Sequence, residues 1–191
     1  MRIGLVLVLL VSSWINSDAR KSDAKSAEKD KSQLEAGEKR FLEVLKLKDF
    51  VVPLSDRNFT KFVSDRPRLY TAAIMFTAIG ERYQCGICET ASKHFQGIAE
   101  FYSNQYNIST VNQEQRLLFF SVDVESAGAV FQKAGIETVP RFFVLPSRKV
   151  GEPKQKLGEH EIDSASIIRG AQYALDDISS ASGVEVRDIT F

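Results

Sequence analysis

The feature that most constrains this chain is the motif Cys85-Gly86-Ile87-Cys88, which contains both of its cysteines. The apolar stretch at 69–76 predicts a strand, and a short loop separates this strand from the motif. Apolar residues then recur at steps of four, four, three and four, as on one face of a helix: Ile87, Ala91, Phe95, Ile98 and Tyr102. A strand, a loop and a Cys-x-x-Cys pair that opens a helix are typical of a redox site.

The predicted position of the two cysteines has a chemical consequence. The first turn of a helix has unpaired N–H groups and the positive end of the helix dipole, and both stabilise a thiolate. Such sites lower a cysteine pKa from about 8.5 toward about 7 or below. We therefore expect Cys85 to be the exposed nucleophile and Cys88, one turn deeper, to be the resolving thiol.

Three other interpretations of the cysteine pair stay open at this point. A zinc site usually needs four Cys or His ligands, and the chain offers only His94 and His160 besides, neither at finger spacing. A purely structural disulfide would close a very short loop and stabilise the fold little. Two unrelated buried thiols are the third interpretation. The redox-active pair is favoured, and we expect neither a metal nor a cofactor.

The N-terminus predicts entry into the secretory pathway. A positively charged start is followed by an apolar run at 3–11, and small residues at 17–19 suit cleavage near Ala19. This run is too short to cross a bilayer core of about 30 Å, and no other stretch approaches transmembrane length. An oxidising compartment would let the cysteine pair cycle. The tripeptides that begin at Asn58 and Asn107 are candidate N-glycosylation sites.

The rest of the chain divides into a leader and one domain. Residues 1–19 are the expected signal peptide, and 20–47 a charged leader, mobile at 20–33, followed by an amphipathic helix. Apolar residues at helical spacing define that helix: Leu34, Phe41, Leu42, Leu45 and Leu47. The expected domain covers 48–182, and 183–191 form a C-terminal segment. Lys+Arg and Asp+Glu both total 25, and this neutral balance argues against nucleic-acid binding.

Within the domain, strands and helices alternate. Strands are predicted at 50–54, 69–76, 117–124 and 141–145, with a polar edge strand near 155–157. Helices are predicted after Ser55 or Asp56, after the cysteine motif, at 127–134, and after Asp163 as a single last helix. This order predicts an α/β fold with a mixed sheet and helices on both faces.

Pro140, immediately before the strand at 141–145, is the second chemical landmark. It could be an ordinary first residue of a strand, but proline is also the residue that tolerates a cis peptide. The order of elements resembles thioredoxin-like folds, in which a cis-proline loop lies opposite the cysteine pair. Such a loop leaves the backbone of the preceding residue, here Val139, free to pair with an extended peptide. We therefore expect Val139 and Pro140 to bind substrate.

Four segments make the resemblance more specific. They are VPLSDRNF at 52–59, AIMFTA at 73–78 with a longer loop before the cysteines, FFSVD at 119–123 and VFQ at 130–132. Together they resemble the luminal domain of the thioredoxin-like subunit of the oligosaccharyltransferase complex. This family includes the tumour suppressor candidate and magnesium transporter proteins. The resemblance covers roughly residues 48–190.

This resemblance implies an oxidoreductase of the endoplasmic reticulum lumen. Its partners would be nascent cysteine-containing polypeptides and the other oligosaccharyltransferase subunits, with Cys85 and Cys88 as the redox pair and Pro140 in the cis-proline loop. Family members continue into four transmembrane helices, so a sequence ending at Phe191 is expected to be a piece of such a protein or a shortened relative. Unlike ordinary thioredoxins, the chain has Met75 in the strand region where they bury an acid, and the residue immediately before Cys85 is Gln84 and not Trp.

Two other functions compete with this expectation. The domain could be a general folding oxidoreductase of the secretory pathway, without a link to glycosylation. It could also be a non-catalytic module that binds extended peptides beside Pro140, with the disulfide only shaping the groove.

Overall fold

The computed structural model describes residues 7–186, and for 7–24 it describes the backbone alone. The α-helices are α1 (Leu7–Leu45), α2 (Asp56–Phe59), α3 (Gly86–Gln105), α4 (Gly128–Ala134), α5 (Ser164–Arg169) and α6 (Ala171–Ser182). The strands are β1 (Val51–Pro53), β2 (Thr71–Thr77), β3 (Leu117–Asp123), β4 (Arg141–Leu145) and β5 (Glu161–Ile162). A π-helical turn, η1 (Thr60–Ser64), continues α2, and short 3-10 turns lie at Glu81–Tyr83 (η2), Gln113–Gln115 (η3) and Leu157–His160 (η4).

The strands form one mixed sheet in the order β1-β3-β2-β4-β5. β1, β3 and β2 are parallel, whereas β4 runs antiparallel to β2 and β5 antiparallel to β4. Every residue of the central strand β2 is buried, because this strand is covered on both faces of the sheet. The α/β class with a mixed sheet, predicted from the sequence, is confirmed.

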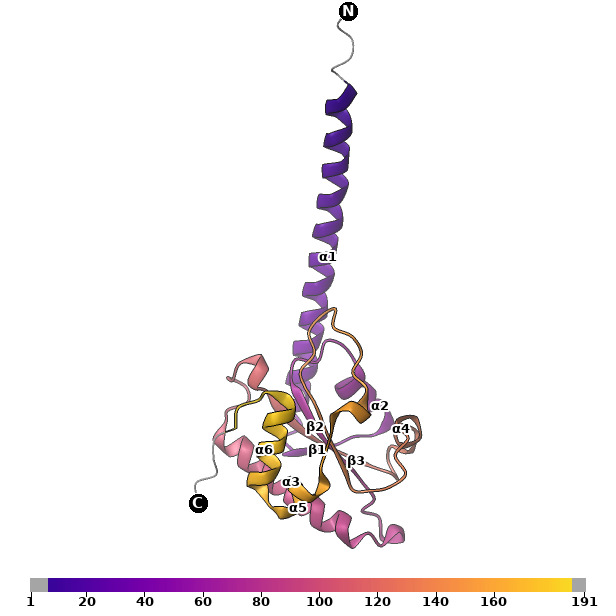
Figure 1. Cartoon of the computed structure of the whole chain (residues 1–191), viewed down its shortest axis with the longest axis vertical. Coiled ribbons are helices and arrows are strands. Elements are labelled where there is room, and N and C mark those ends of the chain that lie inside the picture. The colour runs from indigo at the N-terminus through magenta and orange to yellow at the C-terminus, as the bar shows by residue number, and fades with distance from the viewer. Residues whose placement is uncertain (1–6, 187–191) are drawn as a thin grey trace, which may run out of the picture.

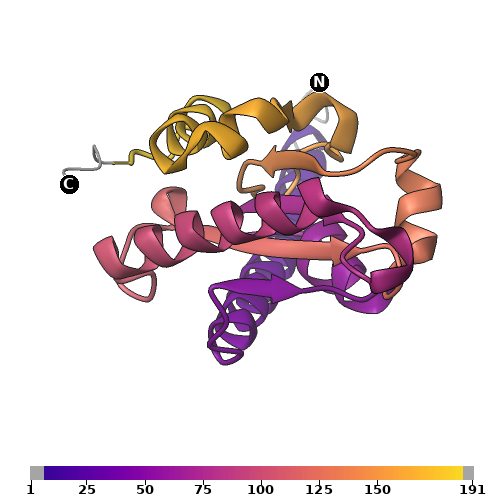
Figure 2. The same ribbon diagram turned by 90° about the horizontal axis from the view of Figure 1, so that it is seen from below.

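Alternate side chains of the strands serve two separate cores. Ala73 and Met75 of β2 face α3, α5 and α6, whereas Ile74 and Phe76 face α1, α2 and α4. The yellow C-terminal helices and the purple end of α1 accordingly lie on opposite sides of the strands in Figure 2. α3, which begins beside the cysteines, therefore belongs to a different layer from α1.

Helix α1 differs from the leader expected from the sequence. Residues 20–33 are part of this helix, which extends away from the domain (Figure 1), and their expected mobility remains a prediction. Nine of the 14 residues in this stretch are Lys, Ala, Arg, Glu or Gln, which have high helix propensity and favour the local structure. The packed part of α1 starts near Gly37, where a Cβ would come within 3.0 Å of Leu69 and Pro67.

The expected apolar face of this helix is correct in part. Phe41 is buried and Leu45 is partly buried against the core, as predicted, whereas Leu34, Leu42 and Leu47 are exposed. Val44, which the prediction did not include, is also buried. The helix reaches the domain with its last turns (Figure 1), and among residues 25–45 the buried side chains lie in these turns. The signal-peptide prediction falls partly on residues 1–6 and the C-terminal prediction partly on 187–191, which lie outside the described residues. Among the described helices, none has the length and apolar character that a membrane span requires.

Two further differences concern the C-terminal part of the domain. The edge strand is β5 at 161–162 and not near 155–157, where Pro153 and a run of polar residues form an irregular loop. The predicted last helix is divided into α5 and α6 at Gly170, whose φ of +135° is open to glycine. Ser55 and Asp163 are N-caps as predicted, with side chains that accept backbone N–H groups of Asn58 and Ala165.

Candidate redox site

The two cysteines lie at the N-terminus of α3 and form a disulfide with an S–S distance of 2.06 Å. Cys85 is the N-cap residue and is half-buried, whereas Cys88 is fully buried. The backbone N–H of Cys88 donates to Cys85 Sγ at 3.3 Å. In the reduced protein this N–H and the helix dipole would stabilise a Cys85 thiolate.

Helix α3 is anchored behind the disulfide by a regular row of side chains. Ala91, Phe95, Ile98 and Tyr102 are all buried, as predicted, against the sheet and the C-terminal helices. Ile87 was expected to join them, but its side chain is 53% exposed. It belongs to the first turn of α3, ahead of the turns that pack on the sheet, so helical periodicity alone gave the wrong environment.

An exposed apolar surface lies along the chain around the cysteines. Ile79 and Tyr83 precede the motif and Ile87 lies within it, and all three side chains are more than a third exposed. Sequence reasoning missed the role of Ile79 and Tyr83 because apolar residues in a loop show no periodicity. Such side chains can contact the apolar groups of a bound polypeptide.

The loop that carries Cys85 is tied to the end of β3. Asp123 accepts the N–H of Ile79 at 2.9 Å, and Arg82 pairs with Glu125 at 2.7 Å. A Cβ on Gly80 would lie 2.5 Å from the Glu125 carboxylate, so glycine permits this close approach. The only sequence signal for these contacts between the loop and the end of β3 was the position of Asp123 at the end of a buried strand.

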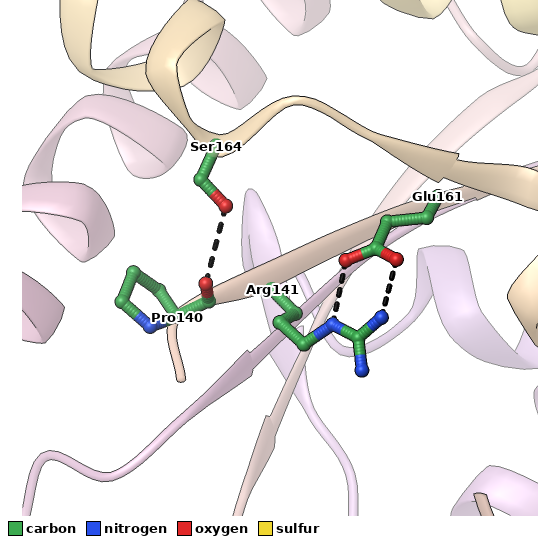
Figure 3. A network of polar contacts seen from close by, with 4 residues as sticks. All are labelled: Pro140, Arg141, Glu161 and Ser164. Carbon is green, nitrogen blue, oxygen red and sulfur yellow. Dashed lines mark hydrogen bonds and ion pairs between the residues drawn. The ribbon is translucent and has the colours of Figure 1, made fainter. Parts of the chain in front are cut away.

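Pro140 lies at the same end of the sheet. The Val139–Pro140 peptide is cis, as predicted. Arg141, the first residue of β4, is paired with Phe76 near the end of β2. Pro140 therefore lies beside the end of β2, from which the chain enters the loop that carries Cys85. The Pro140 carbonyl accepts the Ser164 hydroxyl at 3.2 Å, and Arg141 makes a two-pronged ion pair with Glu161 (Figure 3). This hydrogen bond to Glu161 raises the pKa of Arg141.

The backbone of Val139 is available for pairing. Within residues 7–186, neither its N–H nor its carbonyl has a hydrogen-bond partner, and the residue is only half-buried. An unpaired backbone at the surface next to a strand is suited to binding an extended chain.

The two candidate glycosylation residues differ in their surroundings. Asn58 lies within α2, is half-buried, and donates its backbone N–H to Ser55 Oγ. Asn107 is exposed in a turn, where its side-chain oxygen accepts both the N–H and the hydroxyl of Ser109. Both remain predicted sites.

Comparison with known proteins places this arrangement in a family. The model of the "OST3 / OST6 family, transporter family" matches residues 39–187, which include the cysteine pair and Pro140. The chain belongs to the OST3/OST6 family. This result confirms the resemblance inferred from the sequence.

Individual OST3/OST6 relatives are similar over part of their length. The chain is 30% identical over 156 residues to a mouse protein named dolichyl-diphosphooligosaccharide–protein glycosyltransferase subunit MAGT1, covering 80% of this chain and 41% of the mouse protein. The MAGT1 subunit of Danio rerio is 32% identical over 105 residues, covering 55% of this chain and 30% of that protein. The chain thus spans less than half the length of these curated relatives.

Solved structures support the fold. The Trx4 domain of ERdj5 superposes with a TM-score of 0.50 at 18% identity, covering 69% of this chain and 95% of that domain. At this identity the likeness shows the thioredoxin-like fold alone.

Proposed function

We propose that this chain provides the thiol–disulfide oxidoreductase domain of an accessory subunit of oligosaccharyltransferase. It acts in the lumen of the endoplasmic reticulum and forms transient mixed disulfides with nascent polypeptides, which delays their folding near the glycosylating subunit. The proposal is supported by membership of the OST3/OST6 family and by the relatives that are named as subunits of the glycosyltransferase.

The observation that carries the redox proposal is the unequal exposure of the two bonded cysteines. Cys85 caps α3 and is half-buried, whereas Cys88 is fully buried. A polypeptide can therefore reach only Cys85. An extended segment of the substrate would form backbone hydrogen bonds with Val139, and Ile79, Tyr83 and Ile87 would contact its apolar side chains.

The proposed step is a thiol–disulfide exchange. A thiolate of the polypeptide attacks Cys85 Sγ, the Cys85–Cys88 bond breaks, and Cys88 leaves as a thiolate that takes up a proton. The polypeptide is then bonded to Cys85. Attack by Cys88 on Cys85 Sγ reverses the step and releases the polypeptide thiol. Met75 lies buried where thioredoxins have an acid, so Cys88 would lose its proton slowly and the mixed disulfide would persist.

Paired cysteine variants in secretory cells test this assignment. In Cys88→Ser, the Cys85 thiolate attacks a disulfide of the polypeptide, whose S–S bond breaks and releases the other polypeptide sulfur as a thiolate. No cysteine at position 88 resolves the product, so covalent complexes should accumulate on non-reducing gels. Cys85→Ser should trap nothing, because Cys88 is inaccessible. Equal trapping by both variants would refute the roles. A Cys85→Ser/Cys88→Ser protein is the matched control for non-covalent binding.

The link to glycosylation needs a separate readout. Trapped polypeptides should be enriched in secretory glycoproteins with cysteines near their acceptor sites, and the protein should co-purify with oligosaccharyltransferase subunits. Covalent trapping without either result would leave the oxidoreductase in place and favour a general folding function. Unchanged peptide affinity and cellular function in the double variant would favour a pure binding module.

A further inference from the structure

A second polar feature lies away from the cysteines, in the layer of α1, α2 and α4. Arg68 and Arg148 form an isolated antiparallel bridge, in which each backbone N–H donates to the other's carbonyl at 3.0 and 2.7 Å. Directly opposed residues of such a bridge have adjacent side chains, and like charges there repel one another. Both arginines are only 2% exposed.

Neutral oxygens satisfy most of the hydrogen-bonding groups of Arg68. Its guanidinium donates to the carbonyls of Val63, Tyr70, Leu145 and Pro146 and to the side-chain oxygen of Gln155. None of these acceptors is charged, so the hydrogen bonds position Arg68 without neutralising it. Burial lowers its pKa to about 10, which reflects the cost of a charge withdrawn from water.

Arg148 is less well satisfied. One of its nitrogens donates to the Ser64 carbonyl at 3.0 Å, but its buried Nε has no hydrogen-bond partner. Glu152 is the acid that acts electrostatically on Arg148, and its carboxylate also accepts the backbone N–H of Lys149. A buried donor without a partner is unfavourable, and a bound acceptor would relieve it.

These two arginines line a pocket of about 540 Å³ between η1, α4 and the loop that follows β4. This volume lies within the range of small-molecule sites. Lys133, Lys154 and Lys156 complete its charged lining, and no Asp or Glu belongs to that lining. The three lysines are exposed, and Lys156 forms a weak surface pair with Glu159 at 3.4 Å. Phe59, Val63 and Leu157 supply apolar walls.

We propose that this pocket binds a phosphate-bearing ligand with at least two negative charges. The buried arginine pair supplies a positive potential and the unpaired Nε of Arg148 as a donor. Lys133 and Lys154 contact the ligand from the rim of the pocket. The volume exceeds what a single ion needs, so a diphosphate or an organic phosphate fits better than a monovalent anion. The phosphate could belong to a free small molecule or to the head group of a lipid.

Structural roles of the arginines must be separated from ligand binding, because both also hold the loop at 146–156 in place. The test therefore substitutes the exposed rim, Lys133→Gln and Lys154→Gln together, which leaves the buried pair unchanged. The matched control is Lys39→Gln with Lys93→Gln, two exposed lysines outside the pocket.

Calorimetry on the full chain with inorganic pyrophosphate should give saturable binding that weakens as salt rises. The rim variant should lose at least about tenfold in affinity, equivalent to about 1.4 kcal/mol, while the control changes by less than about twofold. Flotation with phosphatidylcholine vesicles, with and without phosphatidic acid, tests the lipid source by the same pair of variants. Weaker binding of the rim variant than of the control, to either probe, supports the site. The probe that binds shows whether the phosphate belongs to a free small molecule or to a lipid.

Two results would overturn the proposal. One is the absence of binding to both pyrophosphate and phosphatidic acid, and the other is an equal loss in the rim and control variants, which would show non-specific charge attraction. Cys85→Ser should bind pyrophosphate like the wild type, since the pocket and the cysteines lie in different layers of the domain. Failure of this site would therefore say nothing about the redox proposal.

Discussion

Phe95 connects the redox motif to the core, and its truncation gives the sharpest test of the packing. The side chain lies two turns after Cys88 on the same face of α3 and is 1% exposed. Its ring meets those of Phe119 on β3 and Phe142 on β4, each with centroids 5.5 Å apart. Phe95 therefore holds α3 to two strands of the sheet on either side of β2.

The expected cost of Phe95→Ala follows from these contacts. Truncating a buried Phe to Ala costs about 3–5 kcal/mol, from lost burial and the cavity left behind. The two aromatic contacts, worth about 0.5–1.5 kcal/mol each beyond area, favour the upper part of that range. Because domains are stable by only about 5–15 kcal/mol, this loss is a large fraction of the total. For a chain of this size it lowers Tm by roughly 6–20 °C.

Urea unfolding under non-reducing conditions measures this effect while the disulfide stays intact. The midpoint for Phe95→Ala should fall with an unchanged m value. Tyr173→Ala is the control, because Tyr173 is 56% exposed and its loss should stay within about 0.5 kcal/mol. Phe95→Leu should recover part of the stability by refilling the cavity. A Phe95→Ala protein as stable as the Tyr173→Ala control would refute the two-layer packing.

Two further predictions concern the leader and the response to alkali. Trypsin should cut first within residues 20–36, because nearly all side chains at 25–36 are exposed and a helix with little tertiary support is marginally stable. Mass spectrometry would identify the cut, and a resistant leader would contradict this prediction. Burial raises the pKa of Tyr70 and Tyr102. The stability that these two side chains contribute is therefore full below about pH 10 and is lost as pH rises further. The absorbance of their phenolate forms should appear only when the protein unfolds. Arg68 opposes this trend, because burial lowers its pKa to about 10 and the cost of its buried charge therefore decreases as pH rises above about 10.

The sequence predicted the features that depend on local pattern. Strand β2, the cysteines at the start of α3 and the strand after Pro140 follow from apolar runs and helical spacing, whose signal is strong in a buried central sheet. The N-caps at Ser55 and Asp163 were also readable, because a short polar side chain before an apolar stretch satisfies the first N–H groups of a helix.

Errors arose where tertiary contacts decide the environment. Ile87 has the correct spacing for the buried face but lies ahead of the turns that meet the sheet. Leu34 and Leu42 have helical spacing as well, yet α1 touches the domain only with its last turns, on a face defined by Phe41 and Val44. A periodic pattern indicates which residues share a face, and it does not indicate whether another element covers that face.

The arginine pair is the part of the molecule that sequence reasoning had the least means to find. Arg68 and Arg148 are 80 positions apart in the numbering, and an arginine is ordinarily expected at the surface. Their bridge forms because Arg68 leads into β2 while Arg148 follows β4, the antiparallel neighbour of β2. Burial of two like charges that face one another, with no acid in the pocket lining, is unfavourable by itself. Since the described lining of the pocket supplies no negative charge, a bound anion would stabilise the arginine pair, and the rim-lysine experiment tests whether such an anion binds there.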